Sequence, residues 1–204
     1  MSRARLAAVA IALAALGGVG VALVAYLALG SAEAGLALPQ MHGQVSWPAG
    51  ERPAPPFELR DQNGRVVSLP DLRDRPLLIT FLDSRCVEQC PIAGRQLGMM
   101  LRGMAPADRP ALLIVSVDPA GDTPASIRRA MRTWGLAGPY RWHWLRGSKS
   151  ELAAIWRHYG IRGEQASVAL YLIDRRGFKR TGYLFPFLPN FVALDLQTLA
   201  RERV

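Results

Sequence analysis

Phe81-Leu-Asp-Ser-Arg-Cys-Val-Glu-Gln-Cys-Pro91 contains both cysteines of this 204-residue chain, Cys86 and Cys90. The apolar run at residues 77–82 has the length and the β-branched and aromatic content of a buried strand. After Pro91, apolar residues recur at helical spacing as far as residue 104. The two cysteines are therefore expected where a buried strand leads into a helix.

The start of that helix favours a reactive cysteine. Proline is favoured at the first helical position, so we expect the helix to begin near Cys90-Pro91. Free backbone N–H groups and the helix dipole stabilise a thiolate there, and Arg85 is expected to add to this effect. A partly unwound first turn would let the two sulfurs form a disulfide or hold one soft metal ion. We therefore predict that Cys86 and Cys90 form the active site.

A plain structural disulfide between these cysteines is the alternative. A bridge that closes so short a loop removes little entropy from the unfolded chain. Stabilisation of the fold by a disulfide is therefore a weak explanation for the presence of the two cysteines.

The N-terminal region contains a long run without charge, residues 6–29. As a helix it would be about 36 Å long, against a bilayer core of roughly 30 Å. We therefore predict a transmembrane anchor at residues 6–29, preceded by a cytoplasmic N-terminus at residues 1–5. A cleaved signal peptide is the alternative, because Ala32-Glu-Ala34 resembles a cleavage site, although the apolar cores of signal peptides span only about 7–15 residues.

The distribution of basic residues predicts the orientation of this anchor. Arg3 and Arg5 precede it, and no Lys or Arg follows until Arg52. The positive-inside rule then gives a single-pass cell-membrane protein with a cytoplasmic N-terminus and an extracytoplasmic domain. An anchor or a signal peptide would place the domain where disulfides persist.

The net charge of +9 raises the question of an anionic partner. The predicted location and the lack of an aromatic-basic motif argue against nucleic acid. Anionic lipid headgroups or an acidic protein partner fit better. A solvated, arginine-rich surface is the simplest explanation.

Residues 30–55 are rich in glycine, alanine and proline and predict a tether, in which His42 would be solvated. Residues 56–204 predict a folded domain of alternating strands and helices. In chain order these are a hairpin at 57–69, the strand at 77–82 and its helix, a strand at 111–117, a helix at 123–134, a short strand at 141–145, a helix at 148–158, a hairpin at 167–184 and a helix at 190–201.

Helical crossovers between the buried strands imply parallel pairing, and the second hairpin adds antiparallel strands. The predicted fold class is α/β, a thioredoxin-like mixed sheet flanked by helices, with an N-terminal transmembrane helix.

Other residues that could bind a metal are isolated. Asp118 and Asp122 lie in one loop with few further oxygen ligands, so turn and cap chemistry is preferred to a metal site. His143 and His158 are single histidines among aromatic residues, and each is expected to be packed or exposed rather than to act as a ligand.

Five motifs follow one another along the domain. They are Phe57-Glu-Leu-Arg-Asp-Gln-Asn-Gly64, Cys86-Val-Glu-Gln-Cys-Pro91, Val117-Asp-Pro-Ala-Gly-Asp-Thr-Pro124, Trp144-Leu-Arg-Gly147 and Tyr171-Leu-Ile-Asp174. In this order and spacing the chain resembles the Sco (SenC) family of cytochrome oxidase assembly proteins, over roughly residues 56–184. The resemblance implies a thioredoxin-like fold, and a membrane anchor is usual in the family.

The resemblance also implies a copper site. Family members typically bind copper through the two cysteines and a histidine that lies five residues before the tyrosine of Tyr171-Leu-Ile-Asp174. That position is Ala166 here, and the proline usual after the first cysteine is Val87. Two thiolates can still hold Cu(I), whereas Cu(II) prefers additional nitrogen or oxygen ligands.

Dithiol–disulfide exchange needs only an attacking thiolate and a resolving thiol. The leading hypothesis is therefore a membrane-anchored thiol–disulfide reductase with catalytic Cys86 and Cys90, in which the more exposed cysteine attacks. By family analogy the partner would be a protein with reducible cysteines, either a cytochrome oxidase subunit or a copper chaperone.

Two further hypotheses remain. The chain could be a Cu(I) chaperone in which Cys86 and Cys90 are joined by His158 or by a residue of a partner. It could also be a non-catalytic interaction domain with an inert disulfide.

Overall fold

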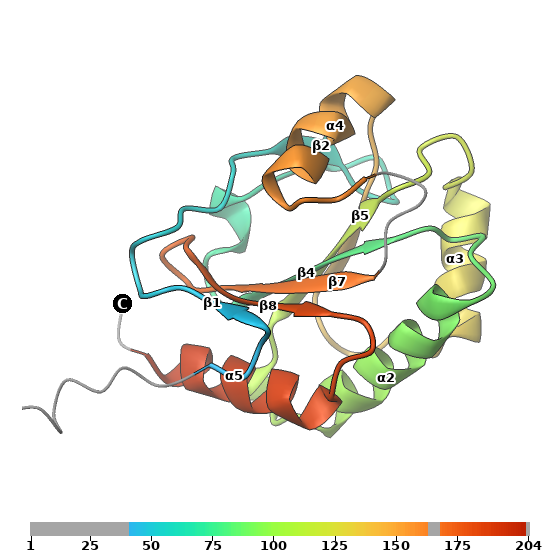
Figure 1. Ribbon diagram of the computed structural model, residues 1–204. Helices are drawn as coiled ribbons and strands as arrows, with labels where there is room; N and C mark the ends of the chain where they lie inside the picture. Colours follow the sequence, from blue (N-terminus) through green and yellow to red (C-terminus); the bar gives the residue numbers. More distant parts are fainter. Residues whose placement is uncertain (1–40, 163–167, 203–204) are drawn as a thin grey trace, which may run out of the picture. The chain divides into compact units, whose positions relative to one another are not determined.

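The computed structural model describes residues 41–162 and 168–202 (Figure 1). The predicted N-terminus and anchor at residues 1–29, and also Ala166, lie outside the described residues. Within the described part of the chain, no helix combines the length and the apolar character needed to cross a membrane.

The described elements follow the predicted alternation of strands and helices. In chain order they are β1 (Val45–Ser46), β2 (Glu58–Arg60), β3 (Val66–Ser68), the 3₁₀ helix η1 (Pro70–Leu72), β4 (Leu77–Leu82), α2 (Gln89–Gly103), the 3₁₀ helix η2 (Pro106–Asp108), β5 (Ala111–Ser116), α3 (Pro124–Thr133), β6 (Trp142–Leu145), α4 (Lys149–His158), β7 (Ala169–Ile173), β8 (Lys179–Leu184) and α5 (Pro189–Arg201).

The main sheet has the strand order β1-β8-β7-β4-β5-β6. β4 pairs in parallel with β5 and antiparallel with β7, which confirms the predicted mixed sheet. Leu82, the last residue of β4, lies opposite Ser116, the last residue of β5. The loops that leave these two strands therefore emerge side by side, at the carboxyl edge where sites of parallel sheets commonly form.

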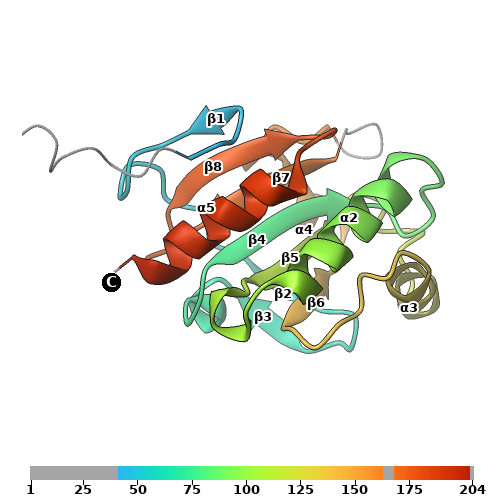
Figure 2. The ribbon, with the colours of Figure 1, turned by 90° about the horizontal axis from the view of Figure 1, so that it is seen from below.

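The sheet is buried on both faces. Along β4, Leu78 and Leu82 join one core cluster, while Ile79 and Phe81 join the other, as the alternation of a strand requires. Residues of α2, α3 and α5 belong to the first cluster, and residues of α4 and the β2–β3 hairpin belong to the second. Figure 2 shows α2 and α5 lying across one face of the sheet. This is the layered α/β arrangement of a thioredoxin-like domain.

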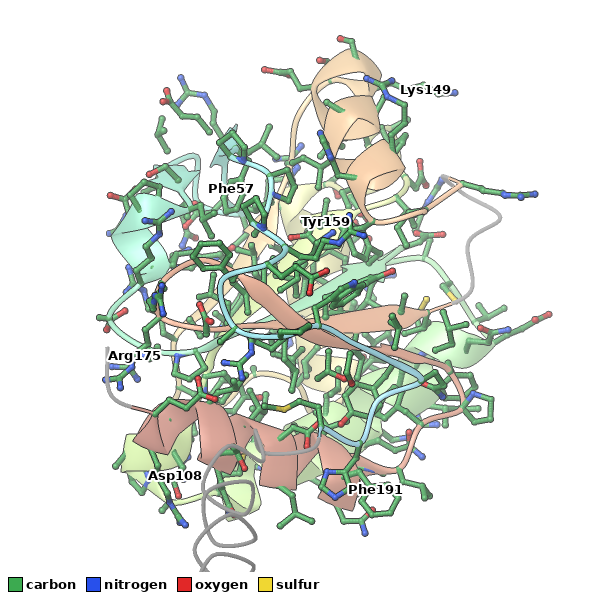
Figure 3. The ribbon with its side chains drawn as sticks, turned by 60° about the vertical axis from the view of Figure 1, so that its left-hand side comes forward. Phe57, Asp108, Lys149, Tyr159, Arg175 and Phe191 are labelled. Carbon is green, nitrogen blue, oxygen red and sulfur yellow. The ribbon has the colours of Figure 1, made fainter. Side chains whose placement is uncertain are left out.

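Side chains seen from another direction confirm the two layers (Figure 3). Phe57 and Tyr159 lie on the side of the sheet that carries α4, whereas Phe191 lies on α5. Tyr159 packs against Phe81 of β4, with 5.3 Å between the ring centroids.

The predicted helix starts are confirmed by capping contacts. The Thr123 hydroxyl accepts a hydrogen bond from the Ser126 N–H, and Pro124 is the first residue of α3. Ser148 and Glu151 form a reciprocal capping box at the start of α4. Local sequence signals therefore determine where these helices begin.

The tether predicted at residues 30–55 includes residues that belong to the folded domain. β1 pairs with β8, so that Val45 lies opposite Gly182. Residues from Met41 onward belong to the same compact unit as the rest of the domain. The prediction was wrong for residues 41–55 because so short a strand has no periodicity of its own and forms through a partner more than 130 residues away.

His42 is likewise held rather than free in solvent. Its Nδ1 lies 2.6 Å from Asp195 Oδ1, and its ring stacks on Phe191 with 4.8 Å between centroids. His42 is exposed, as expected, but the sequence did not predict these two contacts, because both come from α5 at the far end of the chain.

Candidate dithiol site

Both cysteines lie at the start of α2, as predicted. The helix begins at Gln89, and Cys90 is its second residue. The Cys90 backbone N–H donates a hydrogen bond to Cys86 Sγ, with 3.4 Å between nitrogen and sulfur. The first turn therefore directs one of its free N–H groups at the preceding cysteine.

The two thiols differ in exposure. No disulfide joins them in the structure. Cys86 is half-buried, whereas Cys90 is buried, with 7% of its surface exposed. Burial raises the pKa of the Cys90 thiol well above its ordinary value, and its contact with Cys86 adds to this increase. Cys86 is therefore the more accessible sulfur, and Cys90 is held as a thiol beneath it.

A tight turn positions Cys86. The Cys86 N–H donates to the Asp83 carbonyl oxygen at 3.1 Å, and the Arg85 N–H donates to Asp83 Oδ1 at 2.7 Å. Val87, which follows Cys86, is 86% exposed. The turn after β4 thus presents Cys86 and Val87 on the surface of the domain.

Hydrogen bonds to Asp122 connect the turn after β4 with the loop that follows β5. Asp122 accepts hydrogen bonds from the Ser84 N–H at 2.7 Å, the Ser116 hydroxyl at 2.5 Å and the Trp144 indole at 3.2 Å. Burial raises the pKa of Asp122, and these hydrogen bonds partly oppose that effect. The predicted turn and cap role is therefore incomplete, because Asp122 also links the turn after β4 to β5 and β6.

Asp118 forms an ion pair with Arg85. Arg85 Nε lies 3.1 Å from Asp118 Oδ2, and one terminal guanidinium nitrogen donates to the same oxygen. The expectation that Arg85 supports a thiolate at the cysteines was wrong, because its charge is balanced by Asp118. The sequence does not reveal this pairing, which depends on the parallel register of β4 and β5.

A glycine makes this ion pair possible. A Cβ atom at Gly121 would lie 2.0 Å from Asp118 Oδ2 and 2.1 Å from Arg85 Nε. Both distances are far below van der Waals contact, so a side chain at this position would displace the pair.

The other predicted metal-binding candidates do not join the cysteines. His143 Nδ1 contacts Asp61 Oδ2 at 3.1 Å, and His158 is the exposed last residue of α4. Across residues 41–162 and 168–202, no three His, Cys, Asp or Glu side chains gather in a way that could hold a metal ion. Among the described residues, the donors at the site are two sulfurs, a set that suits a soft, low-coordinate ion such as Cu(I) rather than Cu(II).

Comparison with protein families gives one match over most of the domain. The family model described as SCO1/SenC matches residues 48–179. Among curated proteins, none matches this chain.

Several solved structures share the fold. ScoI of Bradyrhizobium japonicum with copper bound is 28% identical, with a TM-score of 0.58, and the match covers 72% of this chain and 98% of ScoI. Yeast Sco1 with copper bound is 20% identical, with a TM-score of 0.61, covering 76% of this chain and 97% of that protein.

A third structure is that of BsSco, described as a member of the Sco family of cytochrome c oxidase assembly proteins. A disulfide switch was identified in BsSco itself. It is 20% identical, with a TM-score of 0.66, and covers 78% of this chain and 99% of its own. At this identity, the matches to yeast Sco1 and BsSco establish the fold.

Proposed function

The chain belongs to the SCO1/SenC family, and on this premise we propose that it is a membrane-anchored thiol–disulfide reductase acting on extracytoplasmic partner cysteines. The observation that carries the proposal is the asymmetry of the dithiol. Cys86 is accessible and receives a backbone N–H, while Cys90 is buried directly behind it. This is the arrangement that exchange needs, one attacking and one resolving sulfur.

The reaction has two steps. The Cys86 thiolate attacks one sulfur of the partner's disulfide, forming a Cys86–partner disulfide and releasing the partner's second cysteine as a thiolate. Cys90 then loses its proton to that thiolate and attacks Cys86 Sγ, which breaks the mixed disulfide and releases the partner's first cysteine as a thiolate. This thiolate takes up from solvent the proton that Cys86 lost before the first attack. The partner gains two electrons and two protons, and the chain ends with a Cys86–Cys90 disulfide that a dithiol donor must reduce again.

The proposed substrate is a protein whose copper-site cysteines must be reduced before they accept metal. Two similar proteins support this choice: ScoI of Bradyrhizobium japonicum was solved with copper bound, and BsSco belongs to a family of cytochrome c oxidase assembly proteins. A cytochrome oxidase subunit or a copper chaperone is the partner class proposed for this chain.

The proposed location follows from the sequence. Residues 1–5 would be cytoplasmic, residues 6–29 would anchor the chain in the cell membrane, and the domain from Met41 onward would be extracytoplasmic. The run of residues without charge and the placement of Arg3 and Arg5 support this arrangement.

The test of reductase activity uses the full chain in detergent and bis(2-hydroxyethyl) disulfide as substrate. The reduced wild type should convert one disulfide into two thiols per chain, and Cys86→Ser should abolish the reaction. Cys90→Ser should stop at a mixed disulfide that mass spectrometry detects. An inert wild type would exclude the reductase and favour a non-catalytic interaction domain.

Cu(I) delivery is the second candidate. It is favoured by the copper-bound ScoI structure and by the contact between Cys90 N–H and Cys86 Sγ, which keeps the two cysteines in one turn. An anaerobic Cu(I) competition titration of the reduced full chain tests it, with the Cys86→Ser/Cys90→Ser variant as control. Stoichiometric binding that the control loses would support delivery, and binding no tighter than that of the control would exclude it.

A further inference from the structure

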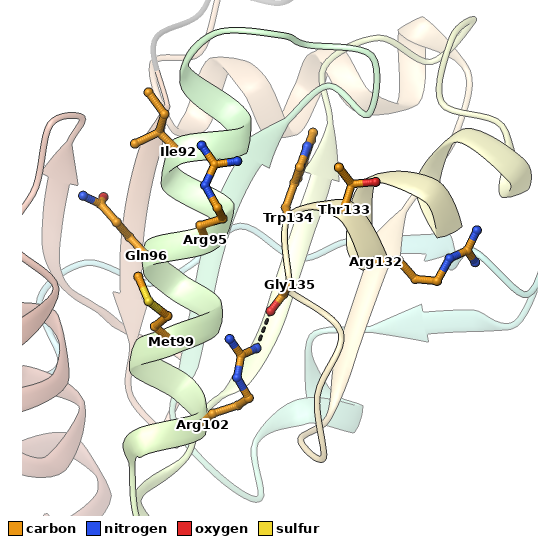
Figure 4. A pocket seen from close by; sticks show the side chains of 9 residues that line it. All are labelled: Ile92, Arg95, Gln96, Met99, Arg102, Arg132, Thr133, Trp134 and Gly135. Carbon is orange, nitrogen blue, oxygen red and sulfur yellow. Dashed lines mark hydrogen bonds between the residues drawn. The ribbon is translucent and has the colours of Figure 1, made fainter.

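A groove lies along α2 on the side that faces the end of α3 (Figure 4). Its volume is about 530 Å³, and its walls include Ile92, Arg95, Met99 and Arg102 from α2, with Arg132 and Trp134 opposite. We call this the arginine groove. Its α2 residues recur three or four positions apart, so they form one face of the helix.

The two walls meet because α2 approaches the α3 end very closely. A Cβ atom at Gly98 would lie only 2.2 Å from the Gly135 carbonyl oxygen. Arg102 closes the far end of the groove, since its guanidinium donates to the same carbonyl oxygen. The groove is therefore formed by the close packing of α2 against the end of α3.

The surface of the groove combines apolar and cationic groups. Met99 is 62% exposed and Ile92 is 44% exposed. Arg95 and Arg102 are also exposed, and Arg132 lies on the rim with its guanidinium directed away from α2 (Figure 4). Within the described part of the chain, none of these three arginines forms an ion pair with a carboxylate. The charge of the groove is thus available to an anionic ligand.

The α2 wall of the groove begins at Ile92, two residues after Cys90 in the sequence. At about 1.5 Å per helical residue, Arg95 lies about 7.5 Å along the axis from Cys90, and Arg102 about 18 Å. An extended peptide advances about 3.3 Å per residue, so roughly two to six residues cover that span. A partner whose disulfide meets Cys86 would place the neighbouring residues of its own chain along this face of α2.

We propose that the arginine groove is a recognition site for an acidic peptide segment of the disulfide-bearing partner, roughly two to six residues from the partner's reactive cysteine. Carboxylates of that segment pair with Arg95 and Arg102, and an apolar side chain contacts Met99 and Ile92. A peptide suits the concave shape better than a membrane, which would need a convex or flat basic surface. The inference rests on the proposed reductase function.

The test compares two peptide substrates. Each contains one intramolecular disulfide, and the acidic probe has glutamates roughly three and six residues after the second cysteine, where the neutral probe has glutamines. The reduced full chain, in neutral detergent, should reduce the acidic probe faster. Arg95→Gln/Arg102→Gln should lower that rate about two- to thirtyfold through the loss of two exposed ion pairs, and leave the neutral probe unchanged.

Two variants control for charge and for folding. Arg128→Gln/Arg129→Gln removes the same charge from exposed positions of α3 outside the groove and should have no such effect. Arg95→Gln alone should give part of the decrease in the rate with the acidic probe. Arg95 is exposed and forms no hydrogen bond or ion pair with another described residue, so this replacement leaves the fold intact. Equal rates for the groove variant and the α3 variant would overturn the proposal.

Two further measurements distinguish peptide recognition from lipid binding and from a failure of the proposed reductase function. If phosphatidylglycerol in the micelles removes the preference for the acidic probe, the groove binds lipid and the proposal is wrong. If the wild type fails even with bis(2-hydroxyethyl) disulfide, the reductase function fails by itself. Binding to the groove is then measured by fluorescence anisotropy of the reduced acidic probe. Equal affinities of the wild type and Arg95→Gln/Arg102→Gln for this probe would overturn the proposed recognition site.

Discussion

Arg85 Nε lies 3.1 Å from Asp118 Oδ2, so the residue before Cys86 is tied to the loop that follows β5. The pair joins two loops separated by more than 30 residues in sequence. Its consequence for the site is electrostatic: the positive charge nearest Cys86 in sequence is directed toward a carboxylate instead of the sulfur.

This relationship predicts a pH dependence of stability. Burial opposes ionisation of Asp118, but the N–H of Gly121 and the Arg85 guanidinium outweigh it and lower the pKa of Asp118. A lowered pKa stabilises the fold above the unfolded value, about 3.9, and this contribution is lost as the pH falls through the folded pKa.

Asp118→Asn should therefore be less stable than the wild type at neutral pH and lose less stability between about pH 5 and pH 2. Urea unfolding across that range measures the difference. Parallel curves for the two proteins would contradict the role of the ion pair.

Alkylation should distinguish the two cysteines. Cys86 is half-buried and accepts a backbone N–H, while burial raises the pKa of Cys90, so iodoacetamide should modify Cys86 about tenfold faster or more. Peptide mapping by mass spectrometry after a short exposure gives the ratio.

In the same assay, Arg85→Gln should change the Cys86 rate little, because Asp118 balances the charge of Arg85. Preferential labelling of Cys90 would reverse the assignment of the attacking sulfur.

Gly121→Ala should destabilise the domain. The added methyl group would overlap Asp118 and Arg85, so the unfolding free energy should fall by about 1–3 kcal/mol. Gly103→Ala is the matched control, since no atom lies within 4 Å of its Cβ position at the end of α2. That change should be neutral or stabilise by up to about 1 kcal/mol. Equal effects in thermal unfolding would contradict the close approach at Gly121.

Ala166→His should restore the third ligand that the family resemblance implies. A nitrogen ligand added to two thiolates should raise Cu(II) affinity by roughly a hundredfold and produce a thiolate-to-copper absorption band. The same change combined with Cys86→Ser/Cys90→Ser should abolish the band. Ser167→His is the positional control, and an identical gain there would show that any nearby imidazole suffices.

Residues 6–29 should hold the chain in the membrane. The full chain should resist alkaline carbonate extraction, and a variant lacking residues 2–29 should be extracted, because the anchor is long enough to span the bilayer core. Intact-mass measurement of the mature protein decides between anchor and signal peptide. A mass that lacks the first 34 residues would favour cleavage at Ala32-Glu-Ala34.

Local sequence pattern was enough to predict the order of the strands and α-helices from β2 onward and the position of the dithiol. The apolar run of β4, the proline after Cys90 and the caps at Thr123 and Ser148 act through neighbours within a few residues, so their effects are readable from local pattern. The spacing of Cys86 and Cys90 likewise predicted a pair at one helix start.

The surroundings of that pair depend instead on contacts between distant parts of the chain. The partner of Arg85, the three donors to Asp122 and the pairing of β1 with β8 depend on strand register, which brings together residues tens to more than a hundred positions apart. The difference between the two cysteines also depends on tertiary packing. Their side chains are chemically identical, but Cys90 packs into the core from the first turn of α2, whereas Cys86 precedes the helix and stays accessible.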